Sequence, residues 1–428
     1  MQNSPDKPLA TGDTVPQSLR ILHTSDWHLG RSLHGRKRYA EFEAFLGWLS
    51  ETLTREAVDV LLVAGDIFDN GTPSNRAQEL YYQFLGRAAA TGCRHVVIVA
   101  GNHDSPTFLD APRQLLRALD VHVVGSSSPD NPADEVLVLH DPRGRAELIV
   151  CAVPFLRDRD LRQVESGESV ADKERKLIEG VHSHYREVAQ IALAKRRELG
   201  GAVPVVGMGH LFATGGRVVD DDGVRELYVG SLARVDAEVI ARDFDYLALG
   251  HLHIPQSVTA ASPTRYSGSP LPMGFGEAGQ PKSVCLVDFR DGQTDIRTLE
   301  IPAFQRLERL RGDWPQIAAR LQELGRARTS VWLEVFYDSA EVIGDLRSRL
   351  DTAVEGTELE VLAVKNTRLV QSVLGQIHAD ETLDDLDPGD VFERCLETHA
   401  VPGDQREGLR AAYREIMQQI NDVDERAE

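Results

Sequence analysis

Five short stretches of the chain, each placed after an apolar run, carry side chains that can bind metal ions. They are Asp26-Trp27-His28, Gly65-Asp66, Gly101-Asn102-His103-Asp104, Gly209-His210 and Gly250-His251-Leu252-His253. An apolar run such as Val60-Leu61-Leu62-Val63 predicts a buried β-strand, and such a strand delivers the side chains that follow it to the rim of a sheet. Five such ends converging on one rim would form a single site, which predicts a layered α/β fold.

The segments between these stretches have the periodicity of helices and further strands. Helical spacing predicts helices over 36–57, 77–91 and 171–199, and strands are expected over 121–124, 135–140, 148–153, 265–270 and 283–289. Alternating strands and helices predict an α/β (α+β layered) fold, in which a β-sandwich is flanked by helices.

A chain of 428 residues with 42% hydrophobic residues is long enough for two or three domains. We expect a disordered N-terminal arm over 1–18 and a catalytic domain over 19–301. A small α+β capping domain follows over 302–370, and a C-terminal linker with a helical partner-binding segment over 371–428. Two amphipathic patterns on either side of Pro402-Gly403 suggest a helix pair whose apolar faces need a partner.

Composition indicates the cellular compartment and the class of protein to which the chain belongs. The four cysteines are scattered and show no C-x-x-C spacing, which disfavours a disulfide framework and a thiolate metal site and fits a reducing cytoplasm. No stretch approaches the ~20 apolar residues of a membrane span, and no signal-peptide pattern is present. The net charge of −20 is concentrated at the end, since 380–428 holds 15 acidic and 5 basic side chains.

The side chains in the five stretches are carboxylates, imidazoles and one carboxamide, a donor set that suits Mn²⁺, Fe²⁺ or Zn²⁺ in a reactive site. Seven of them exceed the needs of one ion: Asp26, His28, Asp66, Asn102, His210, His251 and His253. Two ions that share a bridging carboxylate account for the number. A pair of neighbouring divalent ions activates a water and clamps a phosphoryl group, so the reaction implied is hydrolysis of a phosphoester.

The order D-x-H, G-D-x-x-D, G-N-H-D, G-H and G-H-x-H resembles the calcineurin-type metallophosphoesterase superfamily. Within it, longer stretches such as Thr24 to Gly30, Gly101 to Pro106 and Arg265 to Leu271 resemble the SbcD family, the nuclease subunits of bacterial SbcCD complexes. The resemblance is strong over 19–282 and weaker, in layout more than in motif, beyond it.

The resemblance implies a role for each residue of the site. It places Asp26, His28 and His253 on one ion and Asn102, His210 and His251 on the other, with Asp66 bridging them. His103 would face the scissile phosphate, either protonating the leaving oxygen or stabilising charge. We expect Asp69 to orient His103 in preference to Asp104, because adjacent side chains rarely face each other.

The resemblance also implies cofactors and partners. The metals would be two divalent ions, with Mn²⁺ favoured, and the partner an SbcC-type coiled-coil ATPase in a 2:2 heterotetramer that contains an SbcD-like homodimer. The implied activity is ATP-dependent 3′ to 5′ exonuclease cutting of duplex DNA and endonuclease cutting of single strands and hairpins, in DNA repair and recombination. The chain has no G-x-x-x-x-G-K-[ST] motif, so ATP dependence would come from the partner.

Three alternatives stay open at the level of sequence. A basic cluster of Arg31, His34, Arg36, Lys37 and Arg38 is either a solvated helix start or a contact to the DNA backbone. The protein could be a stand-alone phosphoesterase acting on nucleotides or phosphoproteins, although such an enzyme has no evident use for the C-terminal region. A scaffold that keeps metals for stability is disfavoured by the intact His103.

Overall fold

The computed structural model describes 18–161, 169–217, 234–258, 263–339, 343 and 345–366, with single positions at 392, 393, 396, 406, 410 and 413. The expected arm, apart from Ser18, and nearly all of the expected C-terminal segment lie outside these residues. The chain divides into two compact units, 1–308 and 309–428.

The first unit contains two six-stranded sheets. In the first sheet the order is β14-β13-β1-β4-β5-β6. Its central strands β1 (Leu19–Thr24), β4 (Val60–Ala64), β5 (His95–Val99) and β6 (Val121–Val124) are parallel. The strands β13 (Lys282–Arg290) and β14 (Gln293–Ile301) extend it in antiparallel fashion beside β1.

The second sheet has the order β11-β12-β10-β9-β8-β7. Its parallel core is β8 (Ala146–Ala152), β9 (Val205–His210), β10 (Tyr246–Gly250) and β12 (Thr264–Tyr266), and the short β11 (Gln256–Ser257) and β7 (Val136–His140) pair at its edges. The carboxyl ends of β9 and β10 are in register, with His210 opposite Gly250.

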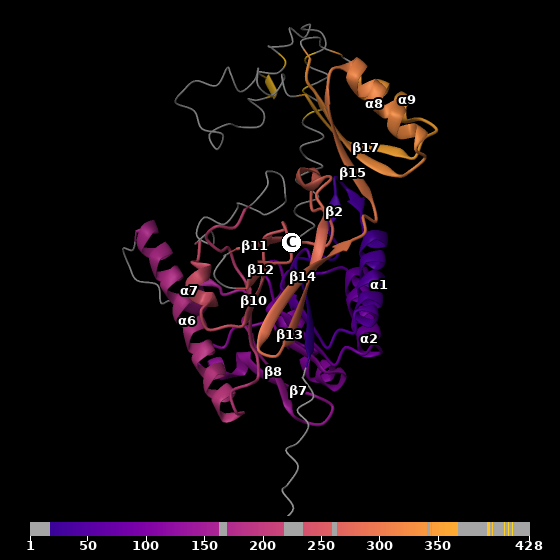
Figure 1. The fold of residues 1–428 in the computed structure, drawn as a ribbon. Helices are drawn as coiled ribbons and strands as arrows, with labels where there is room; N and C mark the ends of the chain where they lie inside the picture. Colours follow the sequence, from indigo (N-terminus) through magenta and orange to yellow (C-terminus); the bar gives the residue numbers. More distant parts are fainter. Residues whose placement is uncertain are drawn as a thin grey trace, which may run out of the picture. The chain divides into compact units, whose positions relative to one another are not determined.

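The two sheets pack face to face around an apolar core. Alternate residues of each strand fill it, for example Leu62 and Val97 from the first sheet and Val206 and Ala248 from the second. Helices cover the outer faces: α1 (Tyr39–Arg55) and α2 (Asn75–Ala89) lie over the first sheet, and α6 (Val170–Glu198) and α7 (Ala237–Ala241) over the second (Figure 1). The predicted fold, a β-sandwich flanked by helices, is confirmed.

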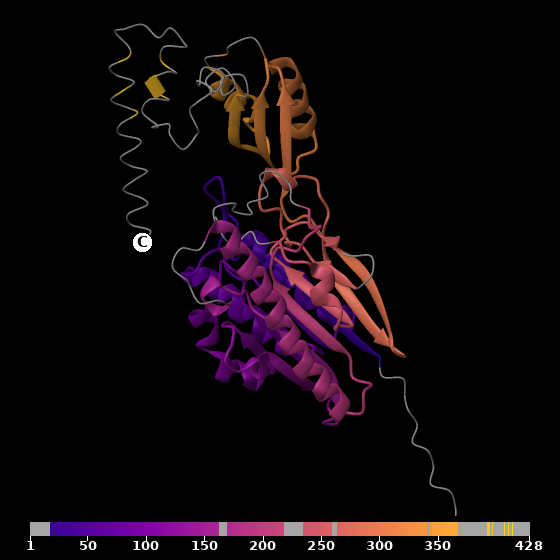
Figure 2. The same ribbon diagram turned by 90° about the vertical axis from the view of Figure 1, so that its left-hand side faces the viewer.

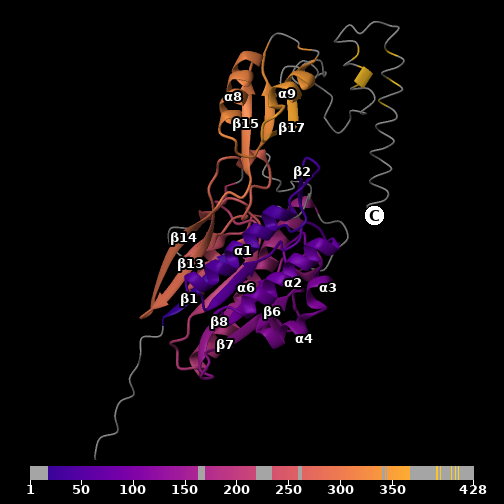
Figure 3. The same ribbon diagram turned by 90° about the vertical axis from the view of Figure 1, so that its right-hand side faces the viewer.

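Local sequence explains how the helices begin. Ser74 accepts a hydrogen bond from the backbone N–H of Ala77 and Ser169 accepts one from Asp172, so each caps the helix that follows it. Helices α1 and α2 lie side by side (Figure 3), and their apolar faces bury Phe42, Phe45 and Phe84 completely. Shorter helices complete the unit: α3 (Pro106–Asp110), α4 (Arg113–Leu116) and α5 (Asp158–Leu161).

Several elements of the first unit were not anticipated from the sequence, among them one long strand and a short hairpin. The strand β14 is mostly exposed, so it lacks the apolar run that marks a buried strand. The strands β2 (Ser32–Leu33) and β3 (Arg36–Lys37) form a hairpin whose two turn residues, His34 and Gly35, both have positive φ. Cys93, Cys151 and Cys285 are buried thiols, and no helix in the described ranges is long and apolar enough to cross a membrane.

The second unit is a small sheet with two helices. The strands β15 (Arg306–Gly312), β16 (Val331–Tyr337) and β17 (Leu359–Asn366) pack against α8 (Trp314–Arg326) and α9 (Leu346–Val354), as Figure 2 shows. Asp313 and Gln316 cap α8 reciprocally. Farther along, the rings of Phe392 and Tyr413 stack with centroids 4.1 Å apart and Arg410 bonds Glu393 at 2.6 Å. These contacts bring together residues on either side of Pro402-Gly403.

Candidate metal centre

The carboxyl ends of five strands from both sheets bring the predicted donors to one place. Asp26 and His28 follow β1, Asp66 follows β4, and Asn102 and His103 follow β5 in the first sheet. From the second sheet, His210 ends β9, and His251 and His253 follow β10. The donors of two sheets meet because β4 and β5 pack directly against β9.

Asp66 lies at the middle of the cluster. Its Oδ2 is 3.2 Å from Nε2 of His210 and 3.5 Å from Nε2 of His28, and its Oδ1 accepts a hydrogen bond of 2.9 Å from the backbone N–H of His103. The Nε2 atoms of His28 and His253 are 3.2 Å apart. One carboxylate therefore faces imidazoles from both sheets.

The Asn102 carboxamide faces the other side of the cluster. Its Oδ1 lies 3.0 Å from Nε2 of His210 and 3.0 Å from Nδ1 of His251. His210 directs its second nitrogen, Nδ1, to the carbonyl of Ala64 at 2.9 Å. Because a carbonyl can only accept, Nδ1 of His210 carries a proton, and Nε2 is the nitrogen that faces the cluster.

Three sets of three possible donors have atoms within 4.8 Å of one another in this cluster, and one of them, His28, Asp69 and His103, is partly exposed. The other two are Asp26, His28 and His253, and Asp26, Asp66 and His210. All side chains of these other two sets are buried, and Asp26 is completely inaccessible. Two buried carboxylates side by side are costly unless positive charge compensates them. The donor types, their convergence and their burial together fit divalent metal ions.

Several residues of the cluster have strained backbone. Asp26, His28, Asp66 and His251 have φ of 53°, 47°, 51° and 106°, in a region that L-residues other than glycine rarely adopt. Each costs on the order of 1 kcal/mol. Hydrogen bonds between the two loops, Asp26 N–H to Gly65 O at 2.9 Å and His28 N–H to Asp66 O at 3.0 Å, hold this conformation. The strain is concentrated where the donors are aimed inward.

Glycines let the strand ends approach closely. A Cβ on Gly250 would collide with the carbonyl oxygen of Ala64 in the other sheet, and one on Gly101 would collide with the carboxylate of Asp66. Gly65 has a positive φ of 87° as well, and a Cβ there would strike the His210 ring. The glycines that precede the donors in the sequence are therefore required by close packing.

Electrostatics inside the cluster are strongly coupled. Burial lowers the pKa of His210, but the carboxylates of Asp66 and Asp26 outweigh burial and raise it to about 9. For Asp66, burial raises the pKa, yet the neighbouring His210 and His28 hold it well below its ordinary value. Burial together with His210 lowers the pKa of His251 to about 3, so this ring is neutral. A neutral imidazole beside an ionised carboxylate is the state that binds a metal ion.

The His103 ring contacts Asp69, but through a different atom from the one expected. Its Nδ1 lies 2.8 Å from the backbone carbonyl of Asp69. The Asp69 carboxylate instead lies 3.5 Å from Nδ1 of His28 and 3.2 Å from the Arg31 guanidinium. Asp104 caps the loops, accepting hydrogen bonds from the backbone N–H groups of Ile67, Phe68 and Gly101.

A buried ion pair behind His253 was missed in the sequence. Glu277 lies 3.7 Å from Nδ1 of His253 and makes a close ion pair with Lys282. The Lys282 ammonium also donates to the carbonyl of His253 and to the hydroxyl of Ser269, each at 3.0 Å. Glu277 is completely buried. No local motif marks a pairing between residues 24 positions apart, so a pattern search along the chain does not find it.

The basic cluster lies on the β2–β3 hairpin and the start of α1. His34, Arg36 and Lys37 are exposed, and Arg31 is partly buried beside Asp69. The prediction that Arg38 contacts DNA is wrong. Its side chain is 1% exposed, donates to the Glu41 carboxylate at 2.9 and 2.7 Å, and donates to the Pro272 carbonyl. Arg38 is therefore part of the core and offers no surface to a polyanion.

Comparisons with known proteins agree with this architecture. Residues 19–255 match the family model for the calcineurin-like phosphoesterases, and residues 303–400 match the model described as the type 5 capsule protein repressor C-terminal domain, SbcD_C. The first match spans the strands from β1 to β10 and all five strand ends of the metal centre.

Among curated relatives, the SbcD subunit of the nuclease SbcCD from Escherichia coli K12 is 34% identical over 398 residues, which cover 92% of this chain and 97% of that protein. The proteins of the same name from Rhodobacter capsulatus and Bacillus subtilis are 34% and 35% identical and cover 82% and 64% of this chain and 88% and 67% of their own lengths. Similarity of this extent means that the chain belongs to the SbcD family, within the calcineurin-like phosphoesterases.

Proposed function

We propose that the protein is a two-metal DNA phosphodiesterase that works as the nuclease subunit of an SbcCD-type complex. The observation that carries this proposal is the position of Asp66, whose Oδ2 lies within 3.5 Å of imidazoles from both sheets. The relatives of the protein are named as nuclease subunits, which supports DNA as the substrate.

The arrangement of donors supports two metal sites that share Asp66. Asp26, His28 and His253 would hold one ion, and Asn102, His210 and His251 the other. Oxygen and imidazole donors without thiolate suit Mn²⁺, which we propose as the metal. When bound, such ions would lower the pKa of a water molecule and offset the charge of the phosphate.

His103 is proposed to act on the leaving group. Because its Nδ1 donates to the carbonyl of Asp69, its Nε2 is the nitrogen left for the substrate. In the imidazolium form, Nε2 donates a proton to the departing oxygen or a hydrogen bond to the phosphate. His34, Arg36 and Lys37 on the exposed hairpin, with Arg31, are proposed to contact the DNA backbone.

The remaining activities and partners rest on family membership. We propose assembly with an SbcC-type ATPase in a 2:2 complex, ATP-dependent 3′ to 5′ cutting of duplex ends, and cutting of single strands and hairpins. The unit from 309 to 428 is proposed to shape the DNA path and to bind the ATPase. A stand-alone phosphoesterase has the same metal centre but needs no such unit.

Cleavage of a DNA hairpin by the purified chain with Mn²⁺ tests this function. His103→Ala should lower the rate by about 10²- to 10⁴-fold while the metal content stays unchanged. His140→Ala, a substitution at an exposed histidine on β7, is the control and should cleave normally. Activity on a nitrophenyl diester without activity on any DNA, even with the ATPase added, would overturn the proposal in favour of a small-substrate enzyme.

A further inference from the structure

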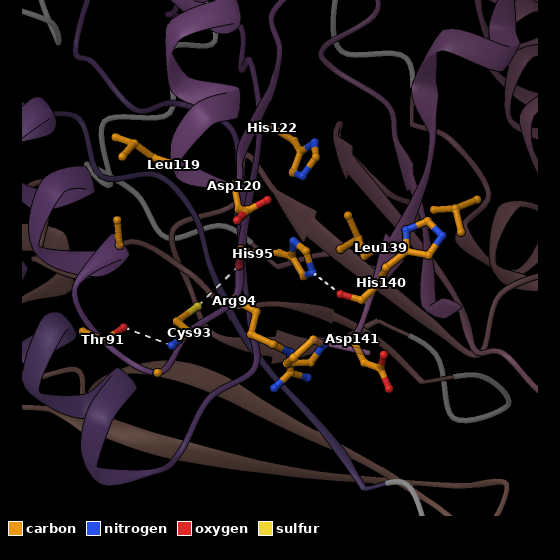
Figure 4. A pocket seen from close by; sticks show the side chains of 14 residues that line it. Thr91, Cys93, Arg94, His95, Leu119, Asp120, His122, Leu139, His140 and Asp141 are labelled. Atoms are coloured by element: carbon orange, nitrogen blue, oxygen red, sulfur yellow. Dashed lines mark hydrogen bonds between the residues drawn. The ribbon is translucent and has the colours of Figure 1, made fainter. Parts of the chain in front are cut away.

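A second cluster of side chains that can bind metal lies at the amino ends of β5 and β6, at the other end of these strands from the first centre. His95 begins β5, whereas the donors Asn102 and His103 follow its other end. Beside it, Asp120 immediately precedes β6 and His122 is the second residue of that strand. These three residues line a pocket of about 590 Å³ shown in Figure 4, separate from the centre around Asp66.

The three side chains already have the spacing of a ligand set. One donor atom from each of His95, Asp120 and His122 lies within 4.8 Å of the other two. Parallel pairing sets this arrangement, because Val97 of β5 is opposite His122 of β6 and the backbone N–H of Val96 donates to the Asp120 carbonyl at 3.0 Å. The exposed Asp120 carboxylate can turn to shorten the remaining gap.

Two ring nitrogens in this cluster lack a hydrogen bond. Nδ1 of His95 and Nε2 of His122 are buried and have no partner among the described residues. His95 is 8% exposed, and Figure 4 shows the rings of His95 and His122 in the pocket with the Asp120 carboxylate beside them. A buried polar atom without a partner costs stability, and a bound cation would supply the missing interaction.

The other nitrogen of His95 has the partners that a metal-binding histidine needs. Its Nε2 lies 2.9 Å from the carbonyl of His140 and 3.6 Å from the carboxylate of Glu147. The carbonyl fixes the proton on Nε2, so Nδ1 keeps its lone pair. Arg94 bonds Glu147 at 2.6 Å and holds it in place.

We propose that His95, Asp120 and His122 form a separate binding site for one divalent transition metal ion, with Zn²⁺ as its probe. Two imidazoles and one carboxylate suit Zn²⁺, Fe²⁺ or Ni²⁺. They do not suit Ca²⁺ or Mg²⁺, which prefer ligand sets made of oxygen atoms alone. Three protein ligands leave a coordination position open toward the pocket. The ion would join the starts of β5 and β6.

Zinc content of the full chain is the first test. After removal of metals with a chelator, addition of micromolar Zn²⁺ and gel filtration, the wild-type chain should hold one zinc more than His122→Ala. Asp120→Asn should weaken zinc binding at least 10-fold, and asparagine keeps the positive φ of 54° at that position without strain. His182→Gln, which changes another histidine with an unpartnered ring nitrogen, is the matched control.

A second measurement separates this site from the metal centre of the proposed function. The Asp66→Ala variant should still hold one zinc ion more than the Asp66→Ala, His122→Ala double variant. Crystals soaked in Zn²⁺ and measured at the zinc absorption edge should show an anomalous peak between His95 and His122. Equal zinc content in wild type and His122→Ala, uptake at millimolar zinc only, or a peak near Asp66 with none at His95 would overturn the proposal.

Discussion

The two sheets of the first unit contribute different chemistry to the metal centre. The first sheet supplies the carboxylates Asp26 and Asp66 and the Asn102 carboxamide along with two histidines, whereas the second supplies histidines alone: His210, His251 and His253. Neither set has enough donors for two ions. The centre is therefore assembled by the packing of one sheet on the other, and its integrity depends on the apolar core between them.

Loss of the shared carboxylate should have the largest effect. Asp66→Ala removes the group that faces imidazoles of both sheets, so we expect DNA cleavage to fall by about 10³-fold or more and the manganese content to drop. Asp295→Ala, at an exposed position of β14 in the same sheet, is the control. Near-normal cleavage by Asp66→Ala would show that the second sheet holds its ion unaided.

The second-largest effect is expected at Glu277, which lies beside His253 of the second sheet. Glu277→Gln leaves Lys282 with a buried charge that lacks its ion-pair partner and loosens His253, so we expect the free energy of unfolding to fall by about 3 kcal/mol. Metal affinity should fall by about 10- to 100-fold. Urea denaturation and manganese titration measure the two effects.

A double variant separates these two effects of Glu277. Lys282→Met in the Glu277→Gln background removes the uncompensated charge and should restore part of the stability while the metal affinity stays low. Recovery of both quantities together would mean that Glu277 acts through folding and has no role in positioning His253.

Asp69, which lies beside His28 of the first sheet, should have a smaller effect on metal affinity and stability than Glu277. Asp69→Asn alters the carboxylate beside His28 but keeps the backbone carbonyl that orients His103. Because Asp69 is partly exposed, we expect metal affinity to fall by about 10-fold and stability to change by less than about 0.5 kcal/mol. A loss of turnover as large as that of His103→Ala, with metals retained, would show that the carboxylate orients His103.

The contact between the two sheets should show its effect only in acid. Nδ1 of His23 on β1 bonds the Tyr246 hydroxyl of the second sheet at 2.9 Å, and burial lowers the pKa of His23 to about 3. The unfolded chain binds a proton near pH 6.5 and the folded chain does not, so this stability is present above pH 6.5 and is lost as the pH falls.

His23→Gln should remove that acid sensitivity while keeping a partner for Tyr246. Between pH 6.5 and 5, the wild-type chain should lose about 1.5 kcal/mol more stability than the variant. Urea denaturation at several pH values measures the difference, in which the titration of all other histidines cancels. Parallel curves for the two chains would place the acid response elsewhere.

Patterns along the chain were enough to predict most of the fold and the donors. Buried strands are continuous apolar runs, so β4, β5 and β10 and the donors behind them could be located from the sequence alone. The strand β14 could not, because an exposed edge strand carries no apolar run. The partners of donors also escaped prediction, since the contact of Glu277 with His253 depends on how distant segments pack.

Arg38 shows a different limit of sequence reasoning. It lies in a run of basic residues, and such runs are usually exposed, yet its bidentate pairing with Glu41 draws it into the core. The spacing of three residues between Arg38 and Glu41 on a helix start was the available signal. For Asp69, the sequence predicted a contact between its side chain and His103, whereas the structure shows a contact with its backbone carbonyl, which has no signature in a sequence.

The fit of Gly250 against the Ala64 carbonyl has a consequence for engineering this enzyme. Directly beneath the donors the floor of the centre is main chain touching main chain, with no side chain in between. The spacing between the donors of the two sheets is therefore a property of the polypeptide backbone itself, and redesigning it would require a new spacing of the sheets.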